Sequence, residues 1–199
     1  CRWTRAAITI DGQGDEAAWK HAQLIHSFAV PWLSEAEQRS PRTRTEARLL
    51  WDRDYLYFLA SMEDGDLFAD IVTHDGKTWH NDVFELFFKP SGQHEGYYEF
   101  QVNAAGTVMD MFIPRRTKTL FDDFINKGEF HLTTRVVLDG TLNQRTDRDG
   151  GWQVEGRIPW TDFRSAGGRP LSGETWSCAL CRYDYDESFP GPDLSTSAP

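Results

Sequence analysis

The sequence has fewer basic than acidic residues. Its 199 residues include 21 Lys and Arg against 31 Asp and Glu, so the formal net charge is −10. Affinity for nucleic acid comes mostly from Lys and Arg that neutralise phosphates, which argues against nucleic acids and anionic membrane surfaces as partners. The chain also lacks any apolar run near the roughly 18 residues of a membrane-spanning helix. Its length predicts a single domain over residues 1–199.

The common catalytic motifs are missing as well. We find no nucleophile elbow, His-Glu-x-x-His motif, phosphate loop or dinucleotide fingerprint. The six histidines are scattered and none is two or four residues from another, so a transition-metal site is not expected. A glycoside hydrolase would need two carboxylates held about 5–10 Å apart. The candidates are four strand carboxylates, Glu85, Glu99, Asp110 and Asp184, and the alternative is that these groups are simply solvated.

Cysteine is scarce, with three residues. Cys178 and Cys181 form a Cys-x-x-Cys motif, which can mark a zinc knuckle or a redox dithiol. The motif lies in an expected strand, where residues three apart point to opposite faces. No second Cys pair completes a tetrahedral site, so both are expected to be structural thiols.

The two ends of the chain suggest that the domain is cut short at both. Cys1 is either the lipid-carrying first residue of a mature lipoprotein or the start of a fragment. The second interpretation is favoured, because residues 2–5 are not the Gly/Ser-rich tether expected beside a lipid anchor. Residues 193–199 end the chain without a closing apolar strand.

Aromatic residues, in contrast, are abundant. Eight Trp, thirteen Phe and six Tyr make up 14% of the chain. Disordered chains are poor in aromatic residues, so the chain is expected to fold. With so many rings in an acidic chain, some should face solvent or a ligand.

The dominant hydrophobic period is two, which predicts strands and little helix. Turn signals recur about every ten residues, the spacing of a β-sandwich. We therefore predict an all-β fold, a two-sheet antiparallel β-sandwich of the jelly-roll or immunoglobulin-like kind, with one or two short helices. The expected strands are 46–51, 55–60, 83–88, 97–103, 107–113, 130–138, 152–158 and 176–185. A short helix is expected over 15–22, with helical turns at 66–72 and 161–165.

The segment 75–88 carries the clearest candidate for binding. Trp79 lies in a polar loop just before a strand, whereas a core Trp usually lies within an apolar run. An exposed indole can stack on the apolar face of a sugar ring, and Glu85 and Gln101 on adjacent strands can bond the hydroxyls. The alternative is that Trp79 caps the sandwich core.

Two further ligands are considered. Calcium prefers oxygen donors, and acidic turns with glycine place Asp11 and Asp15 in one segment and Asp64 and Asp66 in another. Neither segment matches an EF-hand loop, and solvated acidic turns are the alternative. Haem could be ligated by His74 or by the methionines, but core packing is the preferred role of Met62, Met109 and Met111.

The chain resembles the family-9 carbohydrate-binding modules and their kin, a superfamily of β-sandwich domains. The similarity covers nearly the whole chain and rests on four segments. They are Ile8–Trp19 with its Ile-Asp-Gly and Asp-Glu-Ala-Ala-Trp elements, Ala47–Tyr57, Trp79–Phe87, and Trp152–Trp160 with its Val-Glu-Gly-Arg-Ile-Pro-Trp run. Superfamily relatives also include haem-binding sandwiches.

The resemblance implies a site in which two Trp side chains sandwich a sugar. Trp79 matches the first Trp, Glu85 matches a hydrogen-bonding Glu, and Gln101 stands where those members carry Arg. Thr196 stands at the second Trp, and Tyr183, Tyr185 or Phe189 are candidates to replace that ring. The expected sugar-binding set is Trp79, Glu85, Gln101, Asn103, Arg182, Tyr183 and Asp184.

The function implied by the resemblance is non-catalytic binding of an oligo- or polysaccharide. The context would be a secreted, periplasmic or cell-envelope protein that takes part in polysaccharide processing. The alternatives are a glycan-degrading enzyme on the same sheet face and a haem-binding or structural sandwich.

Overall fold

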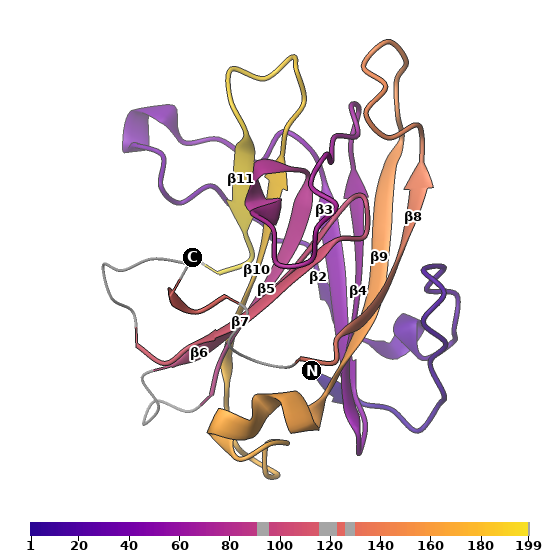
Figure 1. Cartoon of the computed structure of the whole chain (residues 1–199), viewed down its shortest axis with the longest axis vertical. Helices are drawn as coiled ribbons and strands as arrows, with labels where there is room; N and C mark the ends of the chain where they lie inside the picture. Colours follow the sequence, from indigo (N-terminus) through magenta and orange to yellow (C-terminus); the bar gives the residue numbers. More distant parts are fainter. Residues whose placement is uncertain (91–95, 116–122, 126–129, 199) are drawn as a thin grey trace.

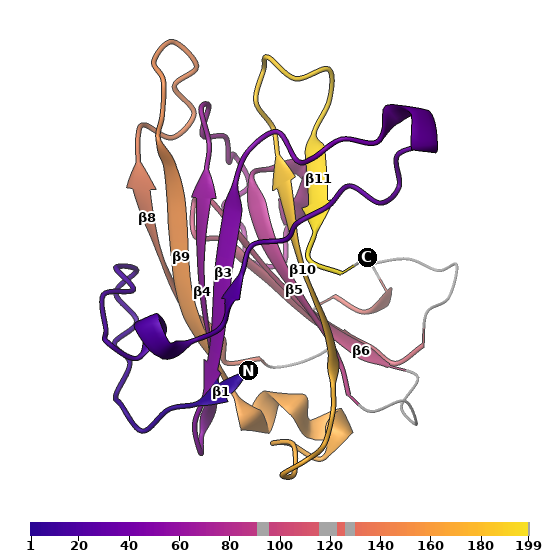
Figure 2. The same ribbon diagram turned by 180° about the vertical axis from the view of Figure 1, so that it is seen from behind.

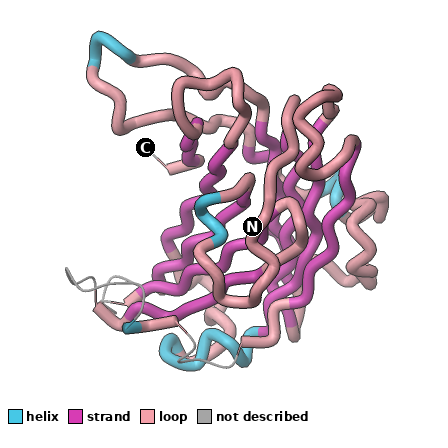
Figure 3. The backbone as a smooth tube through the Cα atoms, turned by 45° about the horizontal axis from the view of Figure 1, so that its top comes forward, coloured by secondary structure: helices cyan, strands magenta, loops and turns pink. Residues whose placement is uncertain are grey.

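The strands form two sheets that pack face to face (Figure 1). The structure, a computed structural model, describes residues 1–90, 96–115, 123–125 and 130–198. Helical elements are short 3₁₀ turns outside the sheets (Figure 3), namely η1 (Trp19–His21), η2 (Glu35–Glu37), η3 (Thr78–His80) and η5 (Trp160–Ala166). The predicted all-β two-sheet sandwich is confirmed.

The first sheet is built around a tight hairpin. Its order is β1-β3-β4-β9-β8, with β2 also paired to β3. Asp52 closes the β3–β4 turn, because its Oδ1 accepts hydrogen bonds from the backbone N–H groups of Asp54 and Tyr55 at 2.8 and 2.7 Å. The strands are β1 (Arg2–Trp3), β2 (Leu24–Ile25), β3 (Thr45–Trp51), β4 (Tyr55–Glu63), β8 (Thr133–Asp139) and β9 (Gly151–Pro159).

The second sheet is antiparallel throughout its described pairings and has the order β11-β10-β5-β6-β7. Its strands are β5 (Val83–Lys89), β6 (Tyr97–Asn103), β7 (Val108–Ile113), β10 (Ser177–Asp184) and β11 (Asp193–Thr196). The edge strand β11 was not predicted. It is four residues long and pairs Thr196 with Cys181, and so short a polar segment carries no alternating pattern.

The main core lies between the sheets. It is rich in aromatic rings, and Phe58, Phe84, Phe100 and Phe163 are each at most 1% exposed. Edge-to-face contacts join several of them, such as Phe88 against Phe163 at 5.8 Å between centroids. Most of the aromatic content of the chain is therefore used in packing.

A second apolar cluster covers the outer side of the first sheet. The N-terminal segment crosses there (Figure 2) and packs Ile8 and Trp19 against Leu50, Tyr57 and Leu59. This explains why residues 56–59 are apolar on both faces of β4.

Glu155 of β9 fastens this N-terminal segment. Its buried carboxylate accepts hydrogen bonds from the backbone N–H groups of Asp11 and Gly12, at 3.2 and 2.9 Å, and from Trp19 Nε1 at 2.9 Å. Gly12 has φ = 87°, a conformation that favours glycine. The Ile-Asp-Gly and Trp elements of the sequence are thus held by one carboxylate.

Two of the three helix predictions need correction. Within 15–22 only η1, at Trp19–His21, is helical. Residues 66–72 are not helical, because side chains take their backbone N–H groups: Leu67 donates to Asp149, Phe68 to Asp82 and Ala69 to Asn143. The turn at 161–165 is confirmed inside η5.

The three cysteines are free. Cys178 pairs with Phe88 and Cys181 with Glu85 in the register of β10 and β5, so the two thiols leave opposite faces of the sheet as predicted. Among the described helices, none has the length and apolar character needed to cross a membrane.

Candidate functional site

The outer face of the second sheet carries a row of polar side chains. The register places Cys181, Glu85 and Gln101 opposite one another on β10, β5 and β6. Side chains alternate along a strand, so all three point away from the sandwich core. Glu99 lies on the same face, diagonally from Glu85. We call the face that holds Glu85, Glu99, Gln101 and Tyr183 the polar face.

Glu85 is the unusual member of the polar face. The residue is only 4% exposed, and its carboxyl group accepts no hydrogen bond from the described residues. Burial, and then the charge of Glu99, raise the pKa of Glu85 well above its usual value. Burial raises the pKa of Glu99 to about 7, although a hydrogen bond from Gln101 opposes the shift. Two carboxyl groups are therefore close together and poorly compensated.

The loop that precedes β5 places Trp79 at this face. In η3, the Thr78 hydroxyl donates a 2.6 Å hydrogen bond to Gln101 Oε1, and Gln101 Nε2 donates to Glu99 at 2.7 Å. Trp79 is half-buried and its ring lies 5.8 Å from that of His80. The predicted platform is therefore tied to the polar face through Thr78.

Two tyrosines extend the aromatic surface. Tyr183 and Tyr185 stack at 6.3 Å with an interplanar angle of 16°. The Tyr185 hydroxyl donates a 2.7 Å hydrogen bond to the Trp79 carbonyl, so the tyrosine pair and the indole share one neighbourhood. Burial, and then the charge of Glu85, raise the pKa of Tyr183 to about 12. Thr196 is buried on the edge strand, so it adds no ring.

Asn103 has a different place from the one predicted. Its Nδ2 donates to the Ile71 carbonyl at 2.8 Å and to Asn81 Oδ1 at 2.9 Å, and its Oδ1 accepts from Thr107 N at 2.8 Å. All these partners belong to the protein, and the residue is fully buried. Asn103 therefore fixes the loop that carries Trp79 and does not face a sugar.

Arg182 and Asp184 also differ from the expectation. They lie on the core-facing side of β10 and are each 1% exposed. Arg182 Nη2 contacts Asp64 Oδ2 and Asp184 Oδ2, both at 3.0 Å, and its Nη1 donates to Thr43 at 2.8 Å. The sequence analysis included both in the sugar-binding set, but they lie on the face of β10 that points inward.

Asp64 and Asp184, the two partners of Arg182, form a cluster with a third aspartate, Asp82. Oxygen atoms of Asp64, Asp82 and Asp184 lie within 4.8 Å of one another, and all three residues are buried. Burial is the main cause that raises the pKa of Asp64 to about 6 and that of Asp82 to about 8. Asp184 Oδ1 has no hydrogen-bond partner in the part of the chain that the structure describes. Asp82 was missed from the sequence because a single Asp before a strand is an ordinary turn residue.

The other acidic residues proposed for calcium do not join this cluster. Asp66 Oδ2 accepts from Arg145 Nη1 at 2.5 Å and from Glu187 N at 3.0 Å. Asp11 closes its own turn by accepting from Gln13 N at 2.9 Å, and Asp15 is exposed. Of the four predicted ligands, only Asp64 meets other carboxylates in the described groups of three potential ligands.

The residues considered as haem ligands have different surroundings. Met62, Met109 and Met111 are each at most 2% exposed, which agrees with packing. His74 belongs instead to a group with Asp75 and Asp110.

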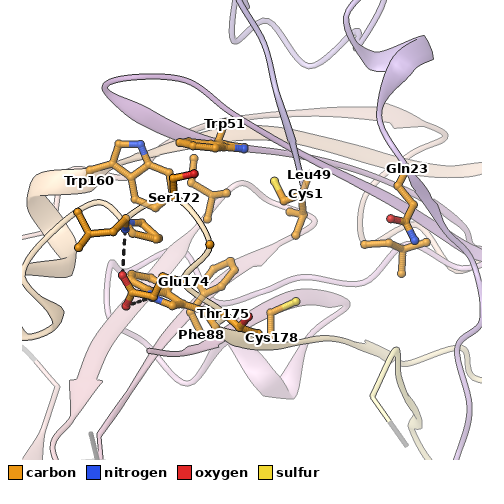
Figure 4. Close-up of a pocket in the computed structure, with 16 residues that line it drawn as sticks. Cys1, Gln23, Leu49, Trp51, Phe88, Trp160, Ser172, Glu174, Thr175 and Cys178 are labelled. Atoms are coloured by element: carbon orange, nitrogen blue, oxygen red, sulfur yellow. Dashed lines mark hydrogen bonds between the residues drawn. The ribbon is translucent and has the colours of Figure 1, made fainter. Parts of the chain in front are cut away.

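An apolar cavity of about 440 Å³ opens at the far end of β5 from η3 (Figure 4). Trp51, Trp160 and Trp176 line it, together with Cys1 and Cys178. Its carboxylate, Glu174, already accepts hydrogen bonds from Trp176 Nε1 and Leu171 N. A sugar would find rings but few open polar partners there, so the polar face is the better candidate for sugar binding.

Comparison with solved structures supports this fold assignment. A Bacteroides uniformis protein, solved as a candidate carbohydrate-binding protein, superposes with a TM-score of 0.71 at 13% identity, covering 98% of this chain and 86% of that one. A family 9 carbohydrate-binding module from Caldicellulosiruptor kristjanssonii matches in complexes with glucose and with cellotriose. The TM-scores are 0.58 and 0.56, at 17% and 18% identity, over 98% of this chain and 83% of that one.

Comparison with characterised sequences gives a shorter match. Endo-1,4-beta-xylanase A of Thermotoga maritima is 33% identical over 99 residues, which are 47% of this chain and 8% of that enzyme. The family model described as "Carbohydrate family 9 binding domain-like" matches residues 10–188. With the sandwich fold, the polar face and this match over most of its length, the chain belongs to the family 9 carbohydrate-binding domain-like family.

Proposed function

We propose that this domain binds a glycan without cleaving it, through the polar face and the aromatic groups beside it. Trp79 stacks on a sugar ring, while Glu85 and Gln101 bond hydroxyl groups. The observation that carries the proposal is Glu85, a buried carboxyl group without a hydrogen-bond partner among the described residues. A buried polar group is normally satisfied, and a ligand hydroxyl would supply the missing bond.

The glucose and cellotriose complexes of the family 9 structural neighbour support a gluco-configured ligand as the first to test. Among the described residues, Gln101 Nε2 donates only to Glu99, which leaves its second N–H to donate to a sugar oxygen. The tyrosine pair Tyr183 and Tyr185 adds apolar area next to the indole. One or two such surfaces imply weak affinity for a single site.

The acid–base state of the polar face favours binding over hydrolysis. A glycoside hydrolase uses one protonated and one ionised carboxyl group. Here the pKa of Glu99 is raised to about 7 and that of Glu85 well above its usual value, so neither carboxyl group is fully ionised at neutral pH. Asp110 and Asp184, the other carboxylates considered, lie on the inward side of their strands.

Trp79→Ala is expected to weaken binding of cello-oligosaccharides by about five-fold, because loss of a stacking ring removes on the order of 1 kcal/mol. Calorimetric titration measures the affinity, and the oligosaccharide should be recovered uncleaved. Trp3→Ala is the matched control, since Trp3 is 46% exposed but lies on the first sheet. Equal binding by wild type and Trp79→Ala, or cleavage of the ligand, would reject the proposal.

We further propose that the Asp64, Asp82 and Asp184 cluster holds Ca²⁺. Three ionised carboxylates against the single charge of Arg182 leave a charge of −2, which one Ca²⁺ balances with oxygen ligands. Asp184 Oδ1 is the unpartnered oxygen that an ion would use. The ion would be structural and would not touch the sugar.

Calcium is expected to raise the melting temperature, and more at pH 8 than at pH 5. The raised pKa values of Asp64 and Asp82, about 6 and 8, mean that protons compete with the ion at the lower pH. Thermal unfolding in CaCl₂ against EDTA measures the shift, and Asp82→Asn should reduce it. Calcium-independent melting at pH 8 would contradict the assignment.

The proposed setting is a secreted or cell-envelope protein that handles polysaccharides. The support is the family match over residues 10–188.

A further inference from the structure

A second group of potential metal ligands lies outside both the polar face and the Asp64 cluster. His74 Nε2 lies 3.6 Å from Asp75 Oδ1 and 3.8 Å from Asp110 Oδ2. One ligand atom from each of the three residues falls within 4.8 Å of the others. His74 and Asp75 come from the loop before η3, and Asp110 comes from β7.

Asp110 is buried and has no partner that satisfies it. The residue is 5% exposed, and its carboxyl group accepts no hydrogen bond from the described residues. The contact with His74 at 3.8 Å is longer than a hydrogen bond. Asp162, another buried carboxylate nearby, differs in this respect, because His131 N and Nδ1 contact its two oxygens at 2.5 and 2.9 Å.

The charges of the group are also unbalanced. Burial, and then the charge of Asp75, raise the pKa of Asp110 to about 6, while His74 and His131 act in the other direction. Asp75 is itself nearly buried and uses Oδ1 to accept from Asp110 N at 3.2 Å. Two carboxylates, one from the loop and one from β7, therefore lie beside one imidazole.

We propose that His74, Asp75 and Asp110 form a binding site for a divalent transition-metal ion such as Zn²⁺. Ligands at about 2.0–2.1 Å from a tetrahedral ion lie about 3.3 Å from one another, so the observed separations need only small side-chain movements. An imidazole nitrogen favours Zn²⁺ over Ca²⁺. The His74 side chain is 62% exposed, so an ion can enter from solvent, and water would complete the coordination.

This site was not expected from the sequence, because no second histidine stands two or four residues from His74. The third ligand comes from Asp110, 36 positions after His74, and only the fold brings it near. The register of β7 with β6 and the bond from Asp75 N to the Val108 carbonyl, 2.9 Å long, set this approach.

The test is calorimetric titration of untagged full-length chain with ZnCl₂ in the presence of excess CaCl₂. We expect one Zn²⁺ per chain, and at least about tenfold weaker binding in both His74→Ala and Asp110→Asn, since each removes a ligand. His21→Ala is the control, because His21 is exposed in η1 on the first sheet.

The proposal is overturned if wild type binds no Zn²⁺, or if both ligand variants bind it as tightly as wild type. Asp110→Asn keeps the size of the side chain and removes a poorly compensated charge, so it should fold at least as well as wild type, which a thermal melt verifies. Because the readout is metal binding alone, its result is independent of whether the polar face binds sugar.

Discussion

Arg182→Met is expected to destabilise the domain by about 3–5 kcal/mol, because removing one partner of a buried ion pair leaves uncompensated charge. Arg182 is 1% exposed and is the cation at 3.0 Å from both Asp64 and Asp184. Methionine fills a similar volume, so the loss should reflect charge more than packing. Urea unfolding measures the change.

The loss should grow as pH rises from 5 to 8. Without the guanidinium, the pKa values of Asp64 and Asp184 rise further, since Arg182 now lowers both. A folded-state pKa above the unfolded value means that the unfolded chain ionises first, so stability falls with increasing pH across that window. Unfolding measured at the two pH values separates this electrostatic effect from a cavity, which would be independent of pH.

Arg145→Met provides the control for a more exposed ion pair. Arg145 contacts Asp66 at 2.5 Å, but its side chain is 27% exposed and the pair is partly solvated. Such pairs contribute at most about 1 kcal/mol. If Arg145→Met and Arg182→Met destabilise equally, the aspartate cluster is not the electrostatic centre described here.

Glu85→Gln is expected to have two opposite effects. It should stabilise the domain by about 1–2 kcal/mol above pH 7, because it removes a buried carboxyl group whose ionisation is disfavoured by burial and by Glu99. It should also weaken glycan binding about tenfold or more, because the carboxyl group proposed to bond sugar hydroxyls is replaced by an amide with a different set of donors and acceptors. A residue that lowers stability and is needed for binding marks a functional position.

The pH dependence of stability tests whether Glu85→Gln stabilises the domain. The raised pKa values of Glu85 and Glu99 predict that wild-type stability falls between the unfolded value of about 4.5 and the folded values, about 7 for Glu99. Glu85→Gln should flatten this fall. Glu63→Gln, at an exposed position ending β4, is the control and should leave both stability and binding unchanged. A destabilised Glu85→Gln that binds glycan normally would show that Glu85 is structural.

Much of the architecture can be predicted from local sequence patterns. Alternation of apolar and polar residues located β3 to β10, and the Asp52 turn between β3 and β4 was visible as a polar break between two apolar runs. Helical turns were predicted less well. Residues 66–72 have helix-compatible composition, but Asp82, Asn143 and Asp149 from distant segments take their N–H groups.

Some residues of the candidate site could also be selected from local sequence, and others could not. Trp79, Glu85 and Gln101 could be selected from the sequence, because a loop tryptophan and strand residues at a period of two are local signals. Asn103 and Arg182 could not be judged, since their hydrogen-bond partners Asn81 and Asp64 lie 22 and 118 residues away. Likewise, only the fold distinguishes the aromatic residues of the core, such as Phe58, Phe84 and Phe100, from Trp79, which lies outside it.

By itself, then, the sequence determined the sandwich, because strand patterns depend on side chains close along the chain, and it offered Trp79 as the candidate ring for stacking on a sugar. Tertiary structure decided which polar groups are satisfied. It paired Arg182 with Asp64 and Asp184, left Glu85 without a partner among the described residues, and brought Asp110 to His74. Hydrogen bonds and charges act over a few ångströms, so they depend on which distant strands the fold makes neighbours.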